Sequence, residues 1–293
     1  MAEAQIAWPE KTREIHTAGL DSTRWNDFAY RAGDIIIATP GKTGTTWVQQ
    51  IVAQLIFEGA DAPVGEISAW LERVGPDLSE VLQSLKAQPH RRFLKTHLPV
   101  DALGLRPDAQ YIFIARDGRD AIFSAYEHVS RVVPEGGLPD VRSFFVGAQD
   151  VFLCRPDPSG GNPLPPMFPT VQSWWNARHL PNVLLVHYNH LKADMPGEIR
   201  RIAGFLKITP SADAWPKIVE HCSFGYMKQN AGSVGSKDHH DLRGGPAAFF
   251  HAGVNGRWRD VLTAEDIENY ERLVAANLTP DCAHWLATGE ITN

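Results

Sequence analysis

The chain has 293 residues, of which 43% are hydrophobic and 21% charged, and this ordinary globular usage excludes an intrinsically disordered protein. A net charge of -6 gives no bulk attraction to nucleic acid or to an anionic membrane, so neither is an expected partner and any phosphate site must be local. The 3 cysteines lie far apart without zinc-ligand spacing, which predicts neither a disulfide framework nor a structural metal.

The segments of the chain predict one domain. The amino-terminal residues lack the basic and apolar regions of a signal peptide, and no apolar run is long enough to span a bilayer. We therefore expect a cytoplasmic protein. Because no low-complexity linker divides the chain, we expect a single domain over residues 1–293.

Short apolar runs predict the strands. They cover residues 35–39, 93–96, 111–115 and 183–186, with helical patterns between or after them. Continuous apolar strands are typical of a parallel sheet that is buried on both faces. The predicted fold is therefore α/β, with a central parallel sheet flanked by helices on both faces.

The first predicted strand leads into a loop whose sequence is similar to the end of a nucleotide-binding P-loop. Residues 41–43, Gly-Lys-Thr, match the last part of the Walker A pattern, but Ile36 occupies the position of its first glycine. Apolar residues then recur at helical spacing over 47–56, and Gly59 lies where the helix would end. The unit is a P-loop-like strand, tight loop and helix.

This loop is predicted to hold an anion. Gly41 and Gly44 allow close backbone approach, so successive amides can point at a charged group before the helix, and Lys42 adds a full positive charge. Hydroxyl donors around the same point suit a group with several charged oxygens. They belong to Thr43, Thr45 and Thr46.

A second strand-to-helix turn follows the third run. Arg116 ends that strand, and Asp117 is positioned to cap the next helix. Lys42, His97 and Arg116 all follow predicted strands. Since ligands of open parallel sheets bind at the carboxyl ends of the strands, we expect these side chains to converge.

Two stretches rich in proline or glycine, residues 132–169 and 228–256, are predicted to be mobile lids or walls of a substrate pocket. Near the end of the chain, Thr263 precedes an apolar helical stripe and predicts the start of a structural helix.

Five segments resemble the cytosolic-type sulfotransferases, enzymes that use 3′-phosphoadenosine 5′-phosphosulfate (PAPS). The loop at 39–47, TPGKTGTTW, resembles the family's phosphosulfate loop, TYPKSGTTW. The other segments occur in the family's order: FLKTHLP at 93–99, IARDGRDAIFSAYEH at 114–128, VHYNHLK at 186–192 and SFGYMKQN at 223–230. The resemblance spans about Arg31 to Glu268.

The resemblance implies in-line transfer of a sulfuryl group from PAPS to a hydroxyl or amine, without a metal, leaving adenosine 3′,5′-bisphosphate (PAP). His97 is the predicted general base, because a neutral imidazole suits proton abstraction near pH 7. Lys42 is expected to stabilise the charge that develops on the leaving oxygen, and Lys95, on the same strand face as His97, to contact the sulfuryl oxygens.

The resemblance also implies a set of donor-binding residues. Trp47 and Phe224 are expected to flank the adenine, and Arg116 with Ser124 to bind the 3′-phosphate. The complete predicted set is Lys42, Thr43, Gly44, Thr45, Thr46, Trp47, Arg116, Ser124, Tyr188, Ser223, Phe224, His251 and Gly253.

The acceptor is expected to be a small molecule, apolar or aromatic. Aromatic residues suggest an apolar pocket, although core packing is the alternative for each. They are Trp25, Phe28, Tyr126, Phe144, Phe145 and Phe168.

One family motif is altered. The family's last donor motif, RKGxxGDWK, reads HAGVNGRWR at 251–259, so both leading basic residues are missing. His251 and the Gly253 amide are weak replacements, and Arg257 can compensate from the next turn. The family's dimerisation motif, KxxxTVxxxE, reads RDVLTAEDIE at 259–268, which makes a homodimer possible.

Two other functions stay open. A P-loop kinase of small molecules would use MgATP, with Asp117 and Asp120 as metal ligands. A PAP- or PAPS-binding protein with weakened catalysis would explain the altered motif. The polar run Asp238-His239-His240-Asp241 resembles a metal site, but we interpret it as a solvated turn and predict no metal.

Overall fold

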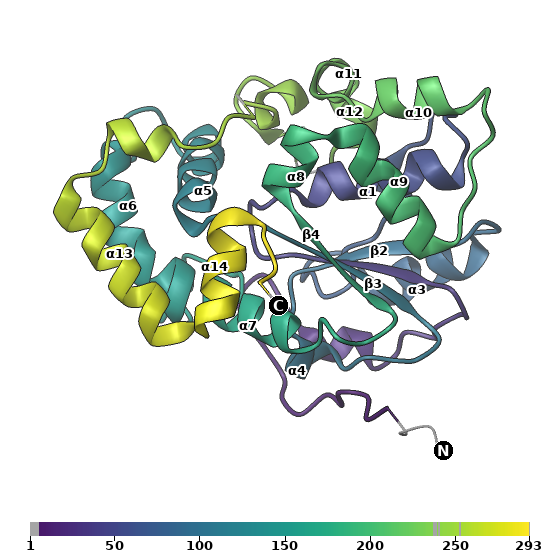
Figure 1. Cartoon of the computed structure of the whole chain (residues 1–293), viewed down its shortest axis with the longest axis horizontal. Helices are drawn as coiled ribbons and strands as arrows, with labels where there is room; N and C mark the ends of the chain where they lie inside the picture. The colour runs from purple at the N-terminus through teal and green to yellow at the C-terminus, as the bar shows by residue number, and fades with distance from the viewer. Residues whose placement is uncertain (1–5, 237–238, 240, 252, 293) are drawn as a thin grey trace.

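A parallel sheet lies at the centre of the computed structural model, which describes residues 6–236, 239, 241–251 and 253–292 (Figure 1). Its 4 strands run in the order β2-β1-β3-β4, and every neighbouring pair is parallel. They are β1 (Ile35–Ala38), β2 (Phe93–Thr96), β3 (Gln110–Ala115) and β4 (Val183–His187). The predicted strands and the α/β class are confirmed.

Helices cover both faces of the sheet (Figure 1). Side chains alternate along a strand, so Ile35 and Ile37 of β1 face one core while Ile36 and Ala38 face the other. The first core is closed by α1 (Thr45–Ile56), α9 (Met195–Leu206) and α10 (Trp215–His221). The second is closed by α4 (Val100–Leu103), α7 (Met167–Asn176) and α14 (Pro280–Thr288).

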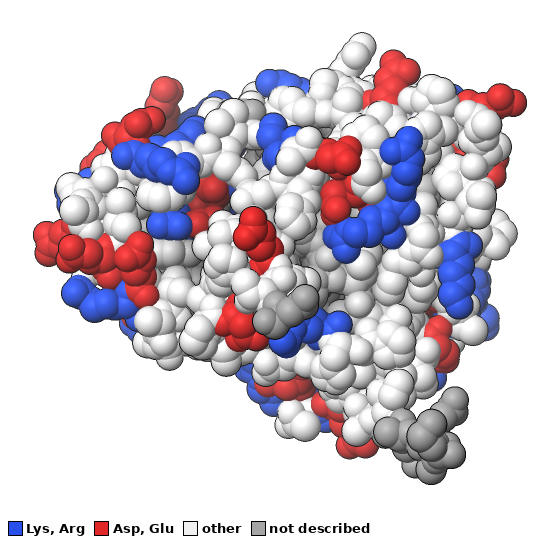
Figure 2. Space-filling model, viewed as in Figure 1, with Lys and Arg blue, Asp and Glu red and all other residues white. Residues whose placement is uncertain are grey.

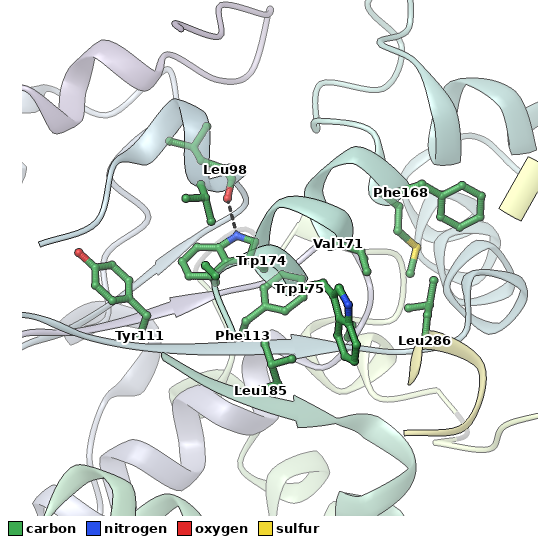
Figure 3. Close-up of a cluster of buried hydrophobic side chains, with 14 of the residues drawn as sticks. Leu98, Tyr111, Phe113, Phe168, Val171, Trp174, Trp175, Leu185 and Leu286 are labelled. Atoms are coloured by element: carbon green, nitrogen blue, oxygen red, sulfur yellow. Dashed lines mark hydrogen bonds between the residues drawn. The ribbon is translucent and has the colours of Figure 1, made fainter. Parts of the chain in front are cut away.

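The second core fixes the turn after β2 (Figure 3). Phe113 of β3 stacks on Trp174 of α7 with ring centroids 5.4 Å apart, and both side chains are fully buried. The indole Nε1 of Trp174 donates to the carbonyl of Leu98 at 3.1 Å. Because Leu98 directly follows His97, the core sets the position of the predicted base.

The remaining helices surround the sheet, and Figure 1 places α5, α6 and α13 at its left, α11 and α12 at its top and α3 at its right. Asp117 caps α5 through the amide of Arg119, and Thr263 caps α13 in a capping box with Asp266, as the sequence predicts. These elements are α2 (Val64–Ile67), α3 (Leu78–Ala87), α5 (Gly118–Val132), α6 (Val141–Gln149), α8 (Tyr188–Ala193), α11 (Phe224–Gln229), α12 (Ala231–Val234) and α13 (Ala264–Asn277), with short 3-10 or π turns at Ser22–Trp25, Asp150–Cys154, Pro246–Phe249 and Arg257–Asp260.

Some boundaries differ from the prediction. Residues 132–169 contain α6 and a π turn, and residues 228–256 contain α12 and a 3-10 turn, so neither stretch is wholly a loop. Their mobility stays a prediction. Helix α1 ends at Ile56, and Gly59, with φ of 78°, lies beyond it and donates to the carbonyl of Gln54.

Charges of both signs occur on the face of the molecule drawn in Figure 2. Figure 2 shows basic and acidic side chains interspersed on this face, with acidic ones gathered at its left edge, where Figure 1 places α13. None of the helices in the described part of the chain combines the length and the apolar composition that a membrane crossing takes.

Candidate active site

A cavity of about 330 Å³ lies where β1, β2 and β3 end, and it brings together most of the predicted site. Its walls include residues from the loop between β1 and α1, which we call the phosphate loop (residues 39–44), and from the end of β2, helix α5 and the segment that follows α12. The predicted residues among them are Lys42, Gly44, Thr45, Thr46, Trp47, Lys95, His97, Arg116, Ser124, Tyr188, Phe224, His251 and Gly253.

The loop between β1 and α1 requires glycine at position 44. Gly44 has φ of 120°, a conformation that residues with a side chain rarely adopt, and a Cβ there would lie 2.8 Å from Cδ1 of Ile114. Gly41 and Gly44 both line the cavity, so backbone is exposed to it before the amino terminus of α1, where anions are favoured.

Thr43 has hydrogen-bond partners within the fold. Its side chain is fully buried, and its hydroxyl contacts Thr39 Oγ1 at 2.5 Å and the carbonyls of Pro40 and Ile114 at 3.0 and 3.2 Å. The hydroxyl therefore ties the loop to β3, and Thr43 is not among the residues that line the cavity. Binding of the anion by Thr43 stays a prediction.

Lys42 carries its charge into the cavity. Its Nζ lies 4.3 Å from the ring centroid of Phe249. Burial, followed by the charges of Lys95 and Arg116, lowers the pKa of Lys42 to about 7. The site therefore gathers more positive charge than it neutralises, which favours a bound anion.

The tautomer of His97 is fixed by its partner. The ring is buried, and Nδ1 lies 2.7 Å from the carbonyl of Thr39, which can only accept a hydrogen bond. Nδ1 must therefore carry the proton, which leaves Nε2 as the basic atom. Burial, then the charge of Lys95 and that of Lys42, lowers the pKa of His97 to about 3, so the ring is neutral at pH 7.

Glu72 supports this arrangement, and the sequence reasoning missed it. The carboxylate is fully buried and accepts from the His97 amide at 2.7 Å, Thr96 Oγ1 at 2.9 Å, and the indoles of Trp70 and Trp25 at 2.8 Å. All these groups are donors, since Thr96 Oγ1 accepts from the Leu98 amide. Burial raises the pKa of Glu72, while the donors oppose that shift and satisfy the ionised form.

Trp70 is a second residue that the sequence reasoning missed. Its ring lies 4.9 Å from that of His97, edge to face, and Lys95 Nζ lies 4.7 Å from its centroid. Trp70 and Lys95 also line a second cavity of about 330 Å³ on the side of α3. No sequence motif marks Trp70, because its role depends on a bridge between its segment and β2.

Three aromatic residues, Trp47, Tyr188 and Phe224, also line the cavity. Trp47 donates from Nε1 to the Cys222 carbonyl at 2.9 Å, and its ring lies 5.5 Å from that of Tyr188. Phe224 is 40% exposed, and a Cβ on Gly253 would lie 3.1 Å from its ring. These surfaces are available to a flat, π-bearing ligand such as a nucleobase.

Ser223 has a hydrogen-bond partner within the fold. Its hydroxyl accepts from the amide of Tyr226 and caps α11, and the residue is not among those that line the cavity. The cap fixes the start of that helix, where Phe224 lies. A contact of Ser223 with the donor stays a prediction.

Arg116 is a buried cation with an unsatisfied donor. Its Nη2 donates to the carbonyl of Val254 at 3.2 Å, and its guanidinium lies 4.4 Å from the ring centroid of Tyr188. Its Nε is buried without a hydrogen-bond partner. A buried guanidinium with an open donor fits a phosphate oxygen.

Helix α5 presents one face to the cavity. Ser124, Glu127, His128 and Arg131 line the cavity at helical spacing, although only Ser124 was predicted. The others follow from it at intervals of three, four and seven residues, a signal that was available in the sequence.

The aromatic residues proposed for an acceptor pocket belong to the interior instead. Trp25, Phe28, Phe145 and Phe168 are buried in the core, and Tyr126 and Phe144 pack edge to face at 5.3 Å. None of the six lines either cavity. Trp70, Phe249 and Phe250 supply the aromatic surface.

A family model described as a sulfotransferase domain matches residues 32–280. The chain belongs to the sulfotransferase family. The glycolipid sulfotransferase of Mycobacterium tuberculosis is 30% identical over 300 residues, covering 92% of this chain and 92% of the relative. Sulfotransferase 1B1 of Mus musculus is 28% identical over 297 residues, covering 92% and 93%.

Solved structures with a similar fold agree with the family match. Retinol dehydratase in complex with androsterone and the inactive cofactor PAP gives a TM-score of 0.69 at 25% identity, covering 89% of this chain and 87% of that one. A mouse sulfotransferase complexed with PAP gives 0.71 at 24% identity, covering 90% and 92%, which shows the fold. With the family match, this makes the chain a PAPS-dependent sulfotransferase, and the kinase alternative is wrong.

The acidic pair expected of the kinase has other partners in this sulfotransferase. Asp117 caps α5 and pairs with Arg119 at 2.6 Å. Asp120 accepts from the amide of Gly256 at 2.8 Å and lies 3.9 Å from Arg116. Neither lines the cavity.

The polar run at 238–241 lies partly outside the described residues, which include His239 and Asp241 but not Asp238 or His240. The ring of His239 stacks on Phe249 at 3.7 Å. Within the described ranges, no group of three potential ligands is placed to hold a metal ion.

Proposed function

We propose that this sulfotransferase moves the sulfuryl group of PAPS to a hydroxyl or amine of a small acceptor with apolar or aromatic character, with His97 as general base. The observation that carries the proposal is the fixed tautomer of His97, whose unprotonated Nε2 belongs to a ring that lines the same cavity as Lys42 and Lys95.

In the proposed reaction the acceptor oxygen attacks sulfur while its proton passes to Nε2 of His97. The new oxygen–sulfur bond forms as the bond between sulfur and the bridging phosphate oxygen breaks, and the electron pair stays on that oxygen as PAP departs. The negative donor offsets the nearby lysines and raises the pKa of His97, which makes the ring a stronger base in the complex.

Lys42 and Lys95 stabilise charge in this scheme. The leaving oxygen gains negative charge in the transition state, so a cation there lowers the barrier more than it stabilises the bound donor. Lys42 lies on the phosphate loop and takes that role. Lys95, whose Nζ lies 4.7 Å from the ring centroid of Trp70, contacts the sulfuryl oxygens in this scheme.

PAPS fits the described residues. Lys42 and the loop amides suit its phosphosulfate, Trp47 and Phe224 offer faces for adenine, and the unpartnered Nε of Arg116 suits the 3′-phosphate. The rings of Trp70 and Phe249 line the cavity, which supports an acceptor with an apolar or aromatic part. Relatives named for glycolipids and a structure holding androsterone support an acceptor with a sizeable apolar part.

We also propose a homodimer through residues 259–268. Arg259, Asp260 and Glu268 are exposed, which leaves the segment available to a second copy, while Leu262 and Asp266 anchor it in the fold. Sedimentation of the native chain, compared with an Asp260→Lys variant, tests this assembly. The expected cytoplasmic location stays a prediction.

The test is transfer of ³⁵S from labelled PAPS to pooled phenols, alcohols and amines, in EDTA. We expect labelled products and stoichiometric PAP. A chain that binds PAP in calorimetry but transfers nothing to any pool would instead be the catalytically weakened binding protein, the second candidate, which the altered motif at His251 favours.

A further inference from the structure

The cavity contains a second cationic group besides Lys42 and Lys95. Arg116 and Arg257 both line the cavity, together with Ser124 of α5. Burial lowers the pKa of the Arg116 guanidinium, the carboxylates of Asp120 and Asp117 oppose that shift, and the positive charge of Arg257 adds to it. An anion that lies between two guanidinium groups can accept charge-assisted hydrogen bonds from both.

The segment that carries Arg257 is fixed to the start of α5. The Val254 carbonyl accepts from Arg116 at 3.2 Å, and the Gly256 amide donates to Asp120 at 2.8 Å. The buried ring of Trp258 lies 3.8 Å from the guanidinium of Arg119. These contacts hold Arg257 beside Arg116 on a defined turn.

Glu127 orients the Arg257 side chain. It accepts from Arg257 Nη1 at 2.9 Å and lies 3.3 Å from Nε2 of His251. A guanidinium has five N–H donors, so this ion pair does not exhaust the capacity of Arg257. Glu127 also balances the cationic group when no ligand is bound.

We propose that Arg257, with Arg116 and Ser124, binds the 3′-phosphate of the donor, taking over from the two leading basic residues that the 251–259 motif lacks. The chain has an arginine at the position where the family pattern RKGxxGDWK has aspartate, so the missing charge returns six residues later. The inference rests on the proposed donor site.

The test separates the 3′-phosphate from the rest of the nucleotide. Calorimetry measures binding of PAP and of adenosine 5′-phosphate, which lacks that group, to the native chain, Arg257→Ala and Arg257→Lys. We expect Arg257→Ala to weaken PAP about ten- to hundredfold, as for a charge-assisted hydrogen bond, and adenosine 5′-phosphate less than twofold. Arg257→Lys keeps the charge without the planar guanidinium, so its PAP affinity should lie between those of the native chain and Arg257→Ala.

Arg200→Ala is the matched control, because Arg200 is also an arginine that packs on an indole ring, that of Trp215 at 4.5 Å, but it is exposed and does not line the cavity. It should bind both nucleotides as the native chain does. Equal losses for both nucleotides in Arg257→Ala, or no loss for PAP, overturn the inference while the proposed function stands. A native chain that binds neither nucleotide overturns both.

Discussion

The two ends of the cavity are held by different interactions. At the proposed sulfuryl-transfer end, a backbone carbonyl fixes the ring of His97, and a buried carboxylate that accepts from four donors fixes its amide. At the proposed 3′-phosphate end, Arg257 pairs with the partly exposed Glu127, which also lies 3.3 Å from His251, and Arg116 donates to loop backbone.

This difference explains which end departs from the family pattern. A base must lie within hydrogen-bond reach of one proton, so its supports leave little freedom. A phosphate has several oxygens and accepts a guanidinium from more than one direction, so the charge can come from a neighbouring turn. The segment around His97 keeps the family's residues, and so do Arg116 and Ser124, while the 251–259 motif is altered and, in our proposal, supplies its charge from Arg257.

The largest expected effect comes from removing the base. His97→Ala should lower kcat about 10²- to 10⁴-fold, because proton transfer then has no positioned acceptor. PAP affinity should change little, since donor contacts are assigned elsewhere. Steady-state rates and PAP calorimetry check this, with His179→Ala at an exposed position as control. Native rates in His97→Ala would remove the general-base role.

The next effect concerns pH and the charge of Lys42. In the free protein the pKa of Lys42 is about 7, so the ammonium loses its proton as pH rises through 7. A bound 5′-phosphate favours the charged form and raises that pKa, so PAP binding takes up a proton. Affinity should therefore fall by up to about tenfold per pH unit between pH 7 and 9.

Calorimetry of PAP binding in buffers of different ionisation enthalpy measures this proton uptake. Lys42→Met keeps the length of the side chain without the charge and should bind PAP weakly with a flat profile. A slope that persists in Lys42→Met would assign the titration to another group.

The smallest effect tests the hydrogen bonds by which Glu72 holds the turn that carries His97. Glu72→Gln places an NH₂ group among buried donors, so the free energy of unfolding should decrease by about 1–3 kcal/mol. With the His97 turn loosened, kcat should fall about tenfold, and PAP affinity should remain, which a general loss of fold would not spare. Chemical denaturation and kinetics measure both, with exposed Glu135→Gln as control.

The sequence predicts the sheet and the carboxyl-edge location well, for a physical reason. Strands buried on both faces read as apolar runs, and ligand-binding residues follow those runs directly, as Lys42, His97 and Arg116 do. Helix α6 was missed because the prolines and glycines around it dominate the pattern of residues 132–169.

Side-chain direction was less predictable. Thr43 and Thr45 look equivalent in the sequence, yet Thr43 turns into the fold and Thr45 lines the cavity. Glu72 and Trp70 reach His97 only because their segment is bridged to β2, a contact across more than twenty residues that no local motif encodes.

Thr39 contacts both the proposed base and the proposed donor-binding loop. Its carbonyl holds the imidazole of His97, and its hydroxyl contacts Thr43 within the donor loop. We therefore expect a change in that loop on donor binding to reach the imidazole directly, because the backbone carbonyl and the side chain of one residue, Thr39, contact the two groups.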